Sequence, residues 1–208
     1  MLYILMSVNV EYSTKEISSN ILNNTLKMLV RRKNLKSGDK IFDDNKDIFI
    51  EKGEIDFKDD NNKKFSLYLN SSKISSIVQG SQLDDYLKNN LDVQKIIIIK
   101  DPSKKVVKQI MTEYTNAEIF MEHELMEDIP SKFFIPEHQL LSDDEKKNLL
   151  ETFKDNELAK INDTDAMSRY YGAKPEDIFR IIRPSITAGY NIFYRRVVSG
   201  NINQLFET

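Results

Sequence analysis

The sequence predicts a mixed α+β protein made of two successive α/β domains. Four consecutive isoleucines at 96–99 lie between charged residues, as in strands that are covered on both faces. Helical patterns on either side of this run predict a three-layer α/β domain in the first part of the chain. Near the C-terminus, two apolar runs at 178–182 and 192–198 flank Pro184 and Gly189. Proline lacks an amide donor and glycine permits a positive φ, so we expect a hairpin there, within a small two-layer α/β domain.

The composition is that of a globular protein with a wet surface. Hydrophobic residues make up 40% of the 208 residues and charged residues 30%, with a net charge of −3. This balance argues against nucleic-acid binding through overall charge. The chain has no cysteine, which excludes disulfides and thiolate zinc sites. No apolar run approaches ~20 residues and residues 1–10 lack a basic leader, so we expect neither a membrane partner nor a signal peptide.

The first helix is expected at about 14–33. Ser13 and Glu16 fit a capping box, in which the hydroxyl caps free amides and the carboxylate reaches back. Apolar residues then follow at helical spacing. The basic residues at 31–33 fall at the end of this helix, where cations suit the helix dipole. We interpret them as a solvated helix end, and a nucleic-acid patch is the alternative.

The next segment, residues 41–64, is strongly charged and carries turn-forming residues. We interpret it as a variable connection that holds one short strand at 48–50. The alternation of apolar and polar residues at 65–69 predicts a half-buried strand. A short amphipathic helix is expected next, from apolar residues at helical spacing: Leu83, Tyr86, Leu87 and Leu91.

The strand at 96–99 is expected to close at 101–103, where the sequence reads Asp-Pro-Ser. Helical spacing at 106–114 and an apolar run at 119–121 complete the α/β layer of this domain.

Residues 126–135 are expected to link the two domains, because Pro130 and Pro136 interrupt regular structure around them. We therefore place the first domain at 1–127 and the second at 128–208.

The second domain begins its helices with another capping box, formed by Ser142 and Glu145. We expect Leu149, Leu150 and Phe153 on the buried side of this helix.

A later helix should start after Asp163 or Asp165 and stop at Gly172, since glycine is favoured just past a helix end. Residues 199–208 are expected to form a loose tail or a small extra contact.

Several separated motifs in the C-terminal third agree in order and spacing. They are Ile-Pro-Glu-His at 135–138, Leu-Ser-Asp-Asp-Glu-Lys-Lys at 141–147, Tyr-Tyr-Gly at 170–172, Ile-Ile-Arg-Pro-Ser-Ile-Thr-Ala-Gly at 181–189 and Tyr-Arg at 194–195. Together they resemble the C-terminal domain of the fifth-largest subunit of eukaryotic DNA-directed RNA polymerases, which has a counterpart in archaeal polymerases. The first two thirds of the chain match this family only loosely, and the family generally lacks a tail such as 199–208.

The resemblance implies that the first domain is a jaw-like domain, similar in fold to restriction endonucleases. In the family, the loop after its central strand lies near downstream double-stranded DNA. Only Pro102 and Ser103 match that loop's motif here, and Asp101 places a negative charge where phosphates would approach. The family's histidine before the Ile-Pro-Glu-His motif is Lys132 in this chain, so no role of that imidazole is carried over.

The resemblance also implies that the second domain docks on the largest polymerase subunit. Arginine and tyrosine are frequent in protein hot spots because both join a large flat area to hydrogen-bonding tips. The same mixture could stack on single-stranded nucleic acid, and many of the aromatic residues must also fill a small core. The expected interface residues are Pro136, His138, Arg169, Tyr170, Tyr171, Gly172, Arg183, Pro184, Ser185, Thr187, Gly189, Tyr194 and Arg195.

The function implied is that of a non-catalytic subunit, present once per polymerase complex and needing no cofactor or metal. Its location would be the nucleus if the source is cellular, or the virion and infected-cell cytoplasm if it is viral. The alternative is a free-standing module that binds nucleic acid or transcription factors.

No catalytic group stands out in the sequence. His123 and His138 are the only histidines, their spacing fits no helical metal pair, and we interpret His138 as a hydrogen-bonded structural residue. The endonuclease-like fold raises a nuclease hypothesis with Asp56, Asp59 and Lys63 around a metal, but likeness of fold is a weak reason for activity.

Overall fold

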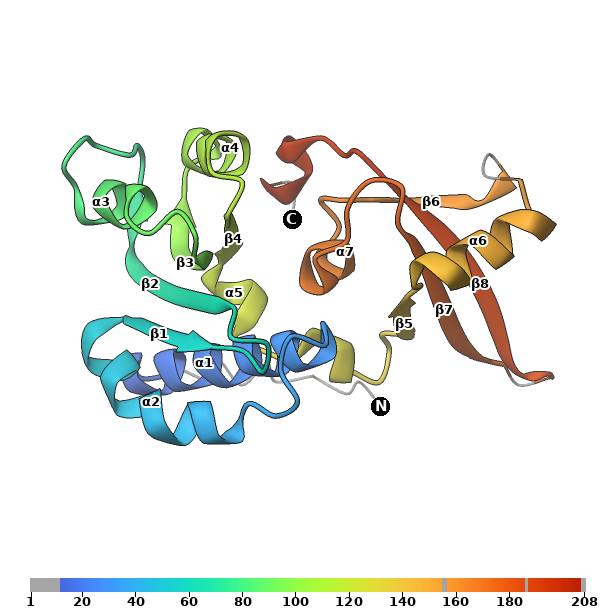
Figure 1. The fold of residues 1–208 in the computed structure, drawn as a ribbon, viewed down its shortest axis with the longest axis horizontal. Coiled ribbons are helices and arrows are strands. Elements are labelled where there is room, and N and C mark those ends of the chain that lie inside the picture. Colours follow the sequence, from blue (N-terminus) through green and yellow to red (C-terminus); the bar gives the residue numbers. More distant parts are fainter. Residues whose placement is uncertain (1–11, 155–156, 186, 207–208) are drawn as a thin grey trace, which may run out of the picture.

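The computed structural model describes residues 12–154, 157–185 and 187–206. Figure 1 shows two α/β units side by side, each built on a four-stranded sheet. This confirms the predicted mixed α+β class. Within the described residues, no helix is both long enough and apolar enough to span a membrane.

The first unit has the sheet order β1-β2-β3-β4, in which only the β1–β2 pair is antiparallel. Its elements are α1 (Thr14–Arg31), α2 (Asp39–Lys52), β1 (Glu54–Lys58), β2 (Lys64–Ile74), α3 (Gln82–Lys88), β3 (Gln94–Pro102), α4 (Lys104–Glu113), β4 (Ala117–Met121) and α5 (Glu122–Leu125).

Alternate residues of β3 enter two different cores. Ile96 and Ile98 pack with apolar residues of α1 and α2, whereas Ile97 and Ile99 pack with those of α3 and α4. The sheet therefore lies between two helical layers, as the isoleucine run predicted. The strand expected at 65–69 is confirmed as part of β2. It is not half-buried as predicted, because four successive side chains at 65–68 are buried on the two covered faces.

The expected connection at 41–64 is the largest error of the sequence analysis. Its first part is the helix α2, which ends at Gly53 in the left-handed conformation, with φ +68°. Phe49 is fully buried against α1, while Ile48 is 44% exposed. The apolar residues at 48–50 therefore belong to a helix and not to the predicted strand. The N-cap residue of this helix is Gly38, which has no side chain to cap the first amides. The sequence therefore lacks the capping residue that usually marks a helix start.

The short helix α3 also differs from its prediction at one end. It stops at Lys88, and Leu91 lies beyond it with 67% of its surface exposed.

The chain enters the second unit through α5 and the 3-10 turn η1 (Ile129–Ser131). The second sheet has the order β5-β7-β8-β6. Its elements are β5 (Glu137–Leu140), α6 (Asp143–Thr152), β6 (Ala159–Asn162), α7 (Ala166–Tyr171), β7 (Ile178–Ser185), β8 (Gly189–Val198) and the 3-10 helix η3 (Ile202–Phe206). The domain boundary after Glu127 stays a prediction.

The predicted hairpin is confirmed as β7 and β8, which pair from Ile178 opposite Arg196 to Ser185 opposite Gly189. Gly189 has φ +75°, as the turn requires. Pro184 lies within β7 rather than in the turn itself.

Helix α6 begins with the predicted capping box. Its buried side is weaker than expected, because Leu149 and Leu150 are only half-buried and Phe153 is 44% exposed. Helix α7 is capped by Asp165, whose Oδ1 accepts from the Met167 amide at 2.8 Å.

Candidate subunit interface

Most of the predicted interface residues fall into two groups with different surroundings. Those at 169–172 lie on or just after α7 and face the first unit. Those at 183–189 lie at the end of the β7–β8 hairpin, where most side chains are exposed. The second group is therefore the more exposed of the two.

The Arg169 side chain is buried against the first unit. Its guanidinium forms an ion pair with Glu124, donates to the carbonyl oxygen of Ile119 and lies 5.0 Å from the ring centroid of Phe120. Only 9% of the Arg169 side chain is exposed. All three contacts are with the first unit, so Arg169 attaches α7 to α5 and β4.

Tyr170 is also buried between the units, with 2% of its surface exposed. Its hydroxyl accepts a hydrogen bond from Nη1 of Arg31 at 2.5 Å and donates to Oδ1 of Asp128 at 3.2 Å. Burial raises the pKa of Tyr170, so the phenol stays protonated and keeps its donor. Arg31 pairs with Asp128 through Nη2 and Oδ2 at 2.7 Å. Burial alone would raise the pKa of Asp128, but the hydrogen bonds and charge of Arg31 lower it.

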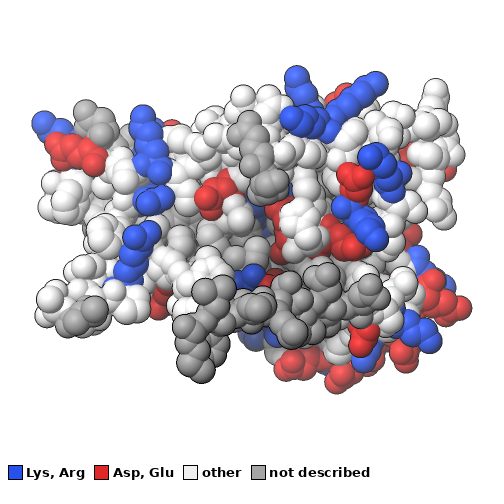
Figure 2. All heavy atoms as spheres, turned by 180° about the vertical axis from the view of Figure 1, so that it is seen from behind, with Lys and Arg blue, Asp and Glu red and all other residues white. Residues whose placement is uncertain are grey.

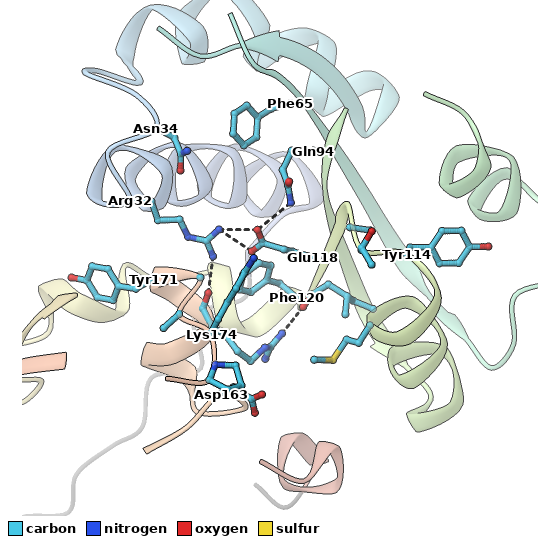
Figure 3. A pocket seen from close by; sticks show the side chains of 18 of the residues that line it. Arg32, Asn34, Phe65, Gln94, Tyr114, Glu118, Phe120, Asp163, Tyr171 and Lys174 are labelled. Atoms are coloured by element: carbon cyan, nitrogen blue, oxygen red, sulfur yellow. Dashed lines mark hydrogen bonds and ion pairs between the residues drawn. The ribbon is translucent and has the colours of Figure 1, made fainter. Parts of the chain in front are cut away.

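Arg32, the next residue of α1, binds the C-terminal end of α7 (Figure 3). Its Nε donates to the carbonyl oxygen of Tyr170 at 2.7 Å, and its Nη2 donates to that of Arg169 at 2.6 Å. Its Nη1 contacts both carboxylate oxygens of Glu118, at 3.0 and 2.8 Å. These groups border a hollow of about 550 Å³ between the units.

Arg31 and Arg32 are therefore not a solvated helix end, because both are engaged at the junction, whereas Lys33 is exposed. Their partners Asp128 and Glu118, and the Arg169 partner Glu124, had no predicted role. Nothing in the sequence marks these carboxylates, since each is separated from its arginine by at least 45 residues.

His138 lies in β5 and is buried, with 9% of its surface exposed. Its Nδ1 lies 2.7 Å from the carbonyl oxygen of Pro136, and its ring meets Phe179 edge to face. Burial lowers the pKa of His138. This is the hydrogen-bonded structural residue that the sequence analysis expected. Tyr171 meets Phe179 from another direction, with ring centroids 5.8 Å apart.

An apolar surface lies exposed around the hairpin, and we call it the hairpin surface. Phe133 is 98% exposed, while Phe134 and Tyr190 are each 63% exposed. Two shallow hollows, of about 500 and 620 Å³, share Ile182 and Tyr190 in their lining, which makes the surface continuous. Its residues are Phe133, Phe134, Ile182, Pro184, Tyr190 and Ile192.

The hairpin surface has the character of a protein contact. Contiguous apolar patches on a soluble protein commonly mark interaction sites. Figure 2 shows Lys and Arg side chains in a line across the C-terminal unit, at the left of that view. One hairpin cation, Arg183, is exposed and lies 5.5 Å from the ring centroid of Phe193. Phe133 and Phe134 had no predicted role, although a Phe-Phe pair between two prolines was a usable signal.

The remaining predicted interface residues have smaller roles in the structure. Ser185 and Thr187 belong to the turn, where Oγ of Ser185 accepts from the amide of Ala188 at 3.3 Å. Tyr194 and Arg195 are half-buried in β8.

The two predicted DNA-proximal residues are at the end of β3. Pro102 is buried as the last residue of that strand, and Ser103 is the N-cap of α4. The Ser103 hydroxyl accepts from the Val106 amide at 3.3 Å and donates to the carbonyl oxygen of Ser75 at 2.8 Å. Lys73 pairs with Asp101 at 3.1 Å, which offsets the negative charge at this loop.

Two residues of the nuclease hypothesis, Asp59 and Lys63, make other contacts in the structure. Oδ1 of Asp59 accepts from the amides of Asn61 and Lys63, so this carboxylate shapes a turn. The ammonium of Lys63 lies 5.3 Å from the ring centroid of Phe65. Across the described part of the chain, no group of three or more His, Cys, Asp or Glu side chains is placed to hold a metal.

Comparison with known proteins places this chain in a family. Residues 127–197 match the family described as RNA polymerase Rpb5, C-terminal domain. DNA-directed RNA polymerase subunit 5 of Acanthamoeba polyphaga mimivirus is 36% identical over 143 residues, which cover 68% of this chain and 69% of that protein. The chain belongs to the Rpb5 family.

Two further relatives define how far the similarity extends. Subunit rpabc1 of DNA-directed RNA polymerases I, II and III from Dictyostelium discoideum is 30% identical over 148 residues, 68% of this chain and 75% of that protein. The archaeal protein Rpo5 of Pyrococcus horikoshii, also a DNA-directed RNA polymerase subunit, is 47% identical over 66 residues, 31% of this chain and 80% of that protein. The viral and Dictyostelium alignments are longer than the second unit, so the Rpb5 similarity reaches into the first.

Proposed function

We propose that this Rpb5 protein is a non-catalytic subunit of a multisubunit DNA-directed RNA polymerase. The observation that carries the proposal is the match to mimiviral and Dictyostelium polymerase subunits over at least two thirds of their length. A free-standing binding module is not favoured, because it would not account for that extent of similarity. The protein would be present once per complex, in the nucleus of a cell or in virions and infected-cell cytoplasm.

The hairpin surface is the proposed attachment site for the largest polymerase subunit. It lies within the segment that matches the Rpb5 C-terminal domain. Aromatic side chains and arginine supply most of the binding energy in typical protein interfaces, and both are exposed here. The residues buried at the junction would then serve to hold the two units in one arrangement while the hairpin surface binds.

The first unit, residues 1–127, is proposed to approach downstream double-stranded DNA through the end of β3 and the start of α4. Exposed lysines lie on β2, β3 and α4, the elements next to Ser103. Lysines can neutralise phosphates, which is the sequence-independent part of DNA binding. The exposed lysines are Lys73, Lys100, Lys104, Lys105 and Lys108. Because Pro102 is buried and the Ser103 hydroxyl is engaged, contact would come from these lysines rather than from the two motif residues.

Reconstitution tests the attachment site. The tagged full-length protein is mixed with the remaining polymerase subunits, and the complex is isolated by gel filtration. Phe133→Ser combined with Phe134→Ser should reduce incorporation, because both side chains lose their apolar area at the proposed interface. Leu91→Ser is the matched control, since Leu91 is an exposed apolar residue of the first unit. Full incorporation of the Phe133/Phe134 variant would refute this attachment site.

Native mass measurement of the same complex tests the copy number and the proposal itself. One copy per assembled polymerase is expected. A protein that never enters the assembled polymerase, although the other subunits assemble, would contradict the subunit role.

The non-catalytic role is tested on the isolated protein. Single- and double-stranded DNA and RNA should stay intact with magnesium or manganese. Metal-dependent cleavage that disappears in Asp56→Asn would overturn this part of the proposal.

A further inference from the structure

The segment after β8 leaves the second sheet and returns to the first unit. Figure 1 shows η3, at the C-terminal end of the trace, beside α4. The match to the Rpb5 C-terminal domain ends at residue 197, so this segment lies outside it. We call residues 199–206 the tail.

The root of the tail is fixed to the turn after β6. The amide of Gly200 donates to Oδ1 of Asp163 at 2.8 Å. The side-chain oxygen Oε1 of Gln204 accepts from Nδ2 of Asn162 at 3.0 Å and from Oγ1 of Thr164 at 3.1 Å. A Cβ atom at Gly200 would lie 2.4 Å from Oγ1 of Thr164, so the backbone passes too close to this turn for any larger residue. These contacts attach the root of the tail to the second unit.

The tip of the tail packs on the first unit. Leu205 and Phe206 are half-buried against the core cluster formed by α3, α4 and the sheet. The ammonium of Lys104 lies 5.5 Å from the ring centroid of Phe206, in the range of a cation–π contact. Lys104 is the first residue of α4 and follows Ser103 directly. The tip thus holds the first turn of the helix next to the proposed DNA-proximal loop.

We infer that the tail is an intramolecular clasp that fixes the orientation of the first unit relative to the second. The Arg31, Arg32 and Arg169 contacts join the units through α1, α5 and β4, whereas the tail joins them through α4. Two attachments at separate places restrict a rotation that one attachment would permit. A consequence that rests on the proposed function is that the clasp also positions the lysines around Ser103 for DNA.

Distance measurement on the isolated full-length protein tests the clasp. The chain has no cysteine, so Lys108→Cys on α4 and Lys147→Cys on α6, both exposed, accept two spin labels without background. Pulsed electron paramagnetic resonance then gives the distribution of distances between the units. In the labelled protein that also carries Leu205→Ser and Phe206→Ser, the distribution should become at least about twofold broader, because the tip no longer packs on α4. Asn203→Ser, at an exposed tail position, is the control and should leave the distribution unchanged.

A second variant separates the clasp from a general loss of folding. Gln204→Ala removes the acceptor at the root and leaves the apolar tip intact, so it should broaden the same distribution without altering circular dichroism. Amide hydrogen exchange in the first turn of α4 should rise by about tenfold in the tip variant, while exchange in β3 stays unchanged. Distributions and exchange rates equal to those of the unmodified protein in both tail variants would overturn the clasp. None of these measurements involves the polymerase, so their failure is distinguishable from a failure of the proposed subunit role.

Discussion

Arg32 lies directly against Gly172, where α7 ends. A Cβ atom on Gly172 would sit 3.2 Å from Cζ of Arg32, and Gly172 has φ +64°. The glycine that stops the helix is thus also the place where the guanidinium from α1 reaches the last carbonyl oxygens of α7. One residue serves the local turn and the contact between the units.

Gly172→Ala should destabilise the protein by about 2–3 kcal/mol, because strain at a positive φ adds to crowding against Arg32. The guanidinium would have to shift slightly, which lengthens its hydrogen bonds to the two carbonyl oxygens and Glu118. Gly80→Ala is the matched control, with φ +75° and no atom within 4 Å of the added Cβ. Gly80→Ala should lower the free energy of unfolding by only about 1–2 kcal/mol, because it introduces backbone strain at a positive φ without crowding. Urea unfolding measures the free energy of unfolding of both variants. An equal decrease in the two would show that Arg32 does not constrain residue 172.

Arg31 and Asp128 should be strongly coupled in a double-mutant cycle. Their side chains are 31% and 12% exposed. Arg31→Met removes the cation that pairs with Asp128, and Asp128→Asn removes the negative charge that pairs with Arg31. We expect a coupling free energy of about 1–2 kcal/mol from chemical denaturation. Arg180 and Glu145, at 29% and 45% exposure, form the reference pair, for which less than about 1 kcal/mol is expected. A coupling at Arg31–Asp128 no larger than that of the reference pair would contradict a stabilising junction.

Gly189→Val should destabilise the hairpin by about 1–3 kcal/mol, because a β-branched residue disfavours φ +75°. No atom lies within 4 Å of the added Cβ, so the loss reflects backbone conformation only. Gly189→Asn should be better tolerated, since asparagine adopts the left-handed region more readily. Thermal unfolding is the measurement, and equal melting temperatures for the valine and asparagine variants would show that the positive φ is not required.

Stability should fall as the pH drops below about 6.5 because of His138. Its folded-state pKa is lowered from the ordinary value of 6.5, first by burial, while the Arg183 and Arg195 charges act in the same direction and Pro136 and Asp165 oppose them. At pH above 6.5 both states are neutral, but below it the unfolded state binds a proton that the folded state resists. In His138→Gln, the free energy of unfolding should no longer fall across this pH window. His123→Gln is the control and should keep the pH dependence of the unmodified protein. A free energy of unfolding independent of pH from 5 to 7 in the unmodified protein would contradict this.

Much of the secondary structure could be predicted because its signals are local. Ser13 and Ser142 cap helices through residues three positions away, and Gly172 and Gly189 adopt the positive φ that the sequence pattern required. Helix α2 could not be predicted, since it lacks a side-chain cap and its charged face obscured the few residues that pack on α1.

The candidate interface was only partly predictable, for a different reason. Arginine and tyrosine are suited equally to a buried junction and to an exposed docking surface, and composition does not separate the two. Arg169 and Tyr170 proved to be buried, whereas Phe133 and Phe134, with no predicted role, are among the most exposed apolar residues described.

The sequence by itself determined the mixed α+β class, the central strand at 96–99, the hairpin and the similarity to polymerase subunits. These follow from hydrophobic periodicity, turn residues and motif spacing, which act within a few residues of the chain. Only the tertiary structure decided that the end of α1 binds α7, that the tail returns to α4 and that the hairpin surface stays uncovered. Those contacts join residues up to 139 positions apart, and such pairings depend on how whole elements pack rather than on any local pattern.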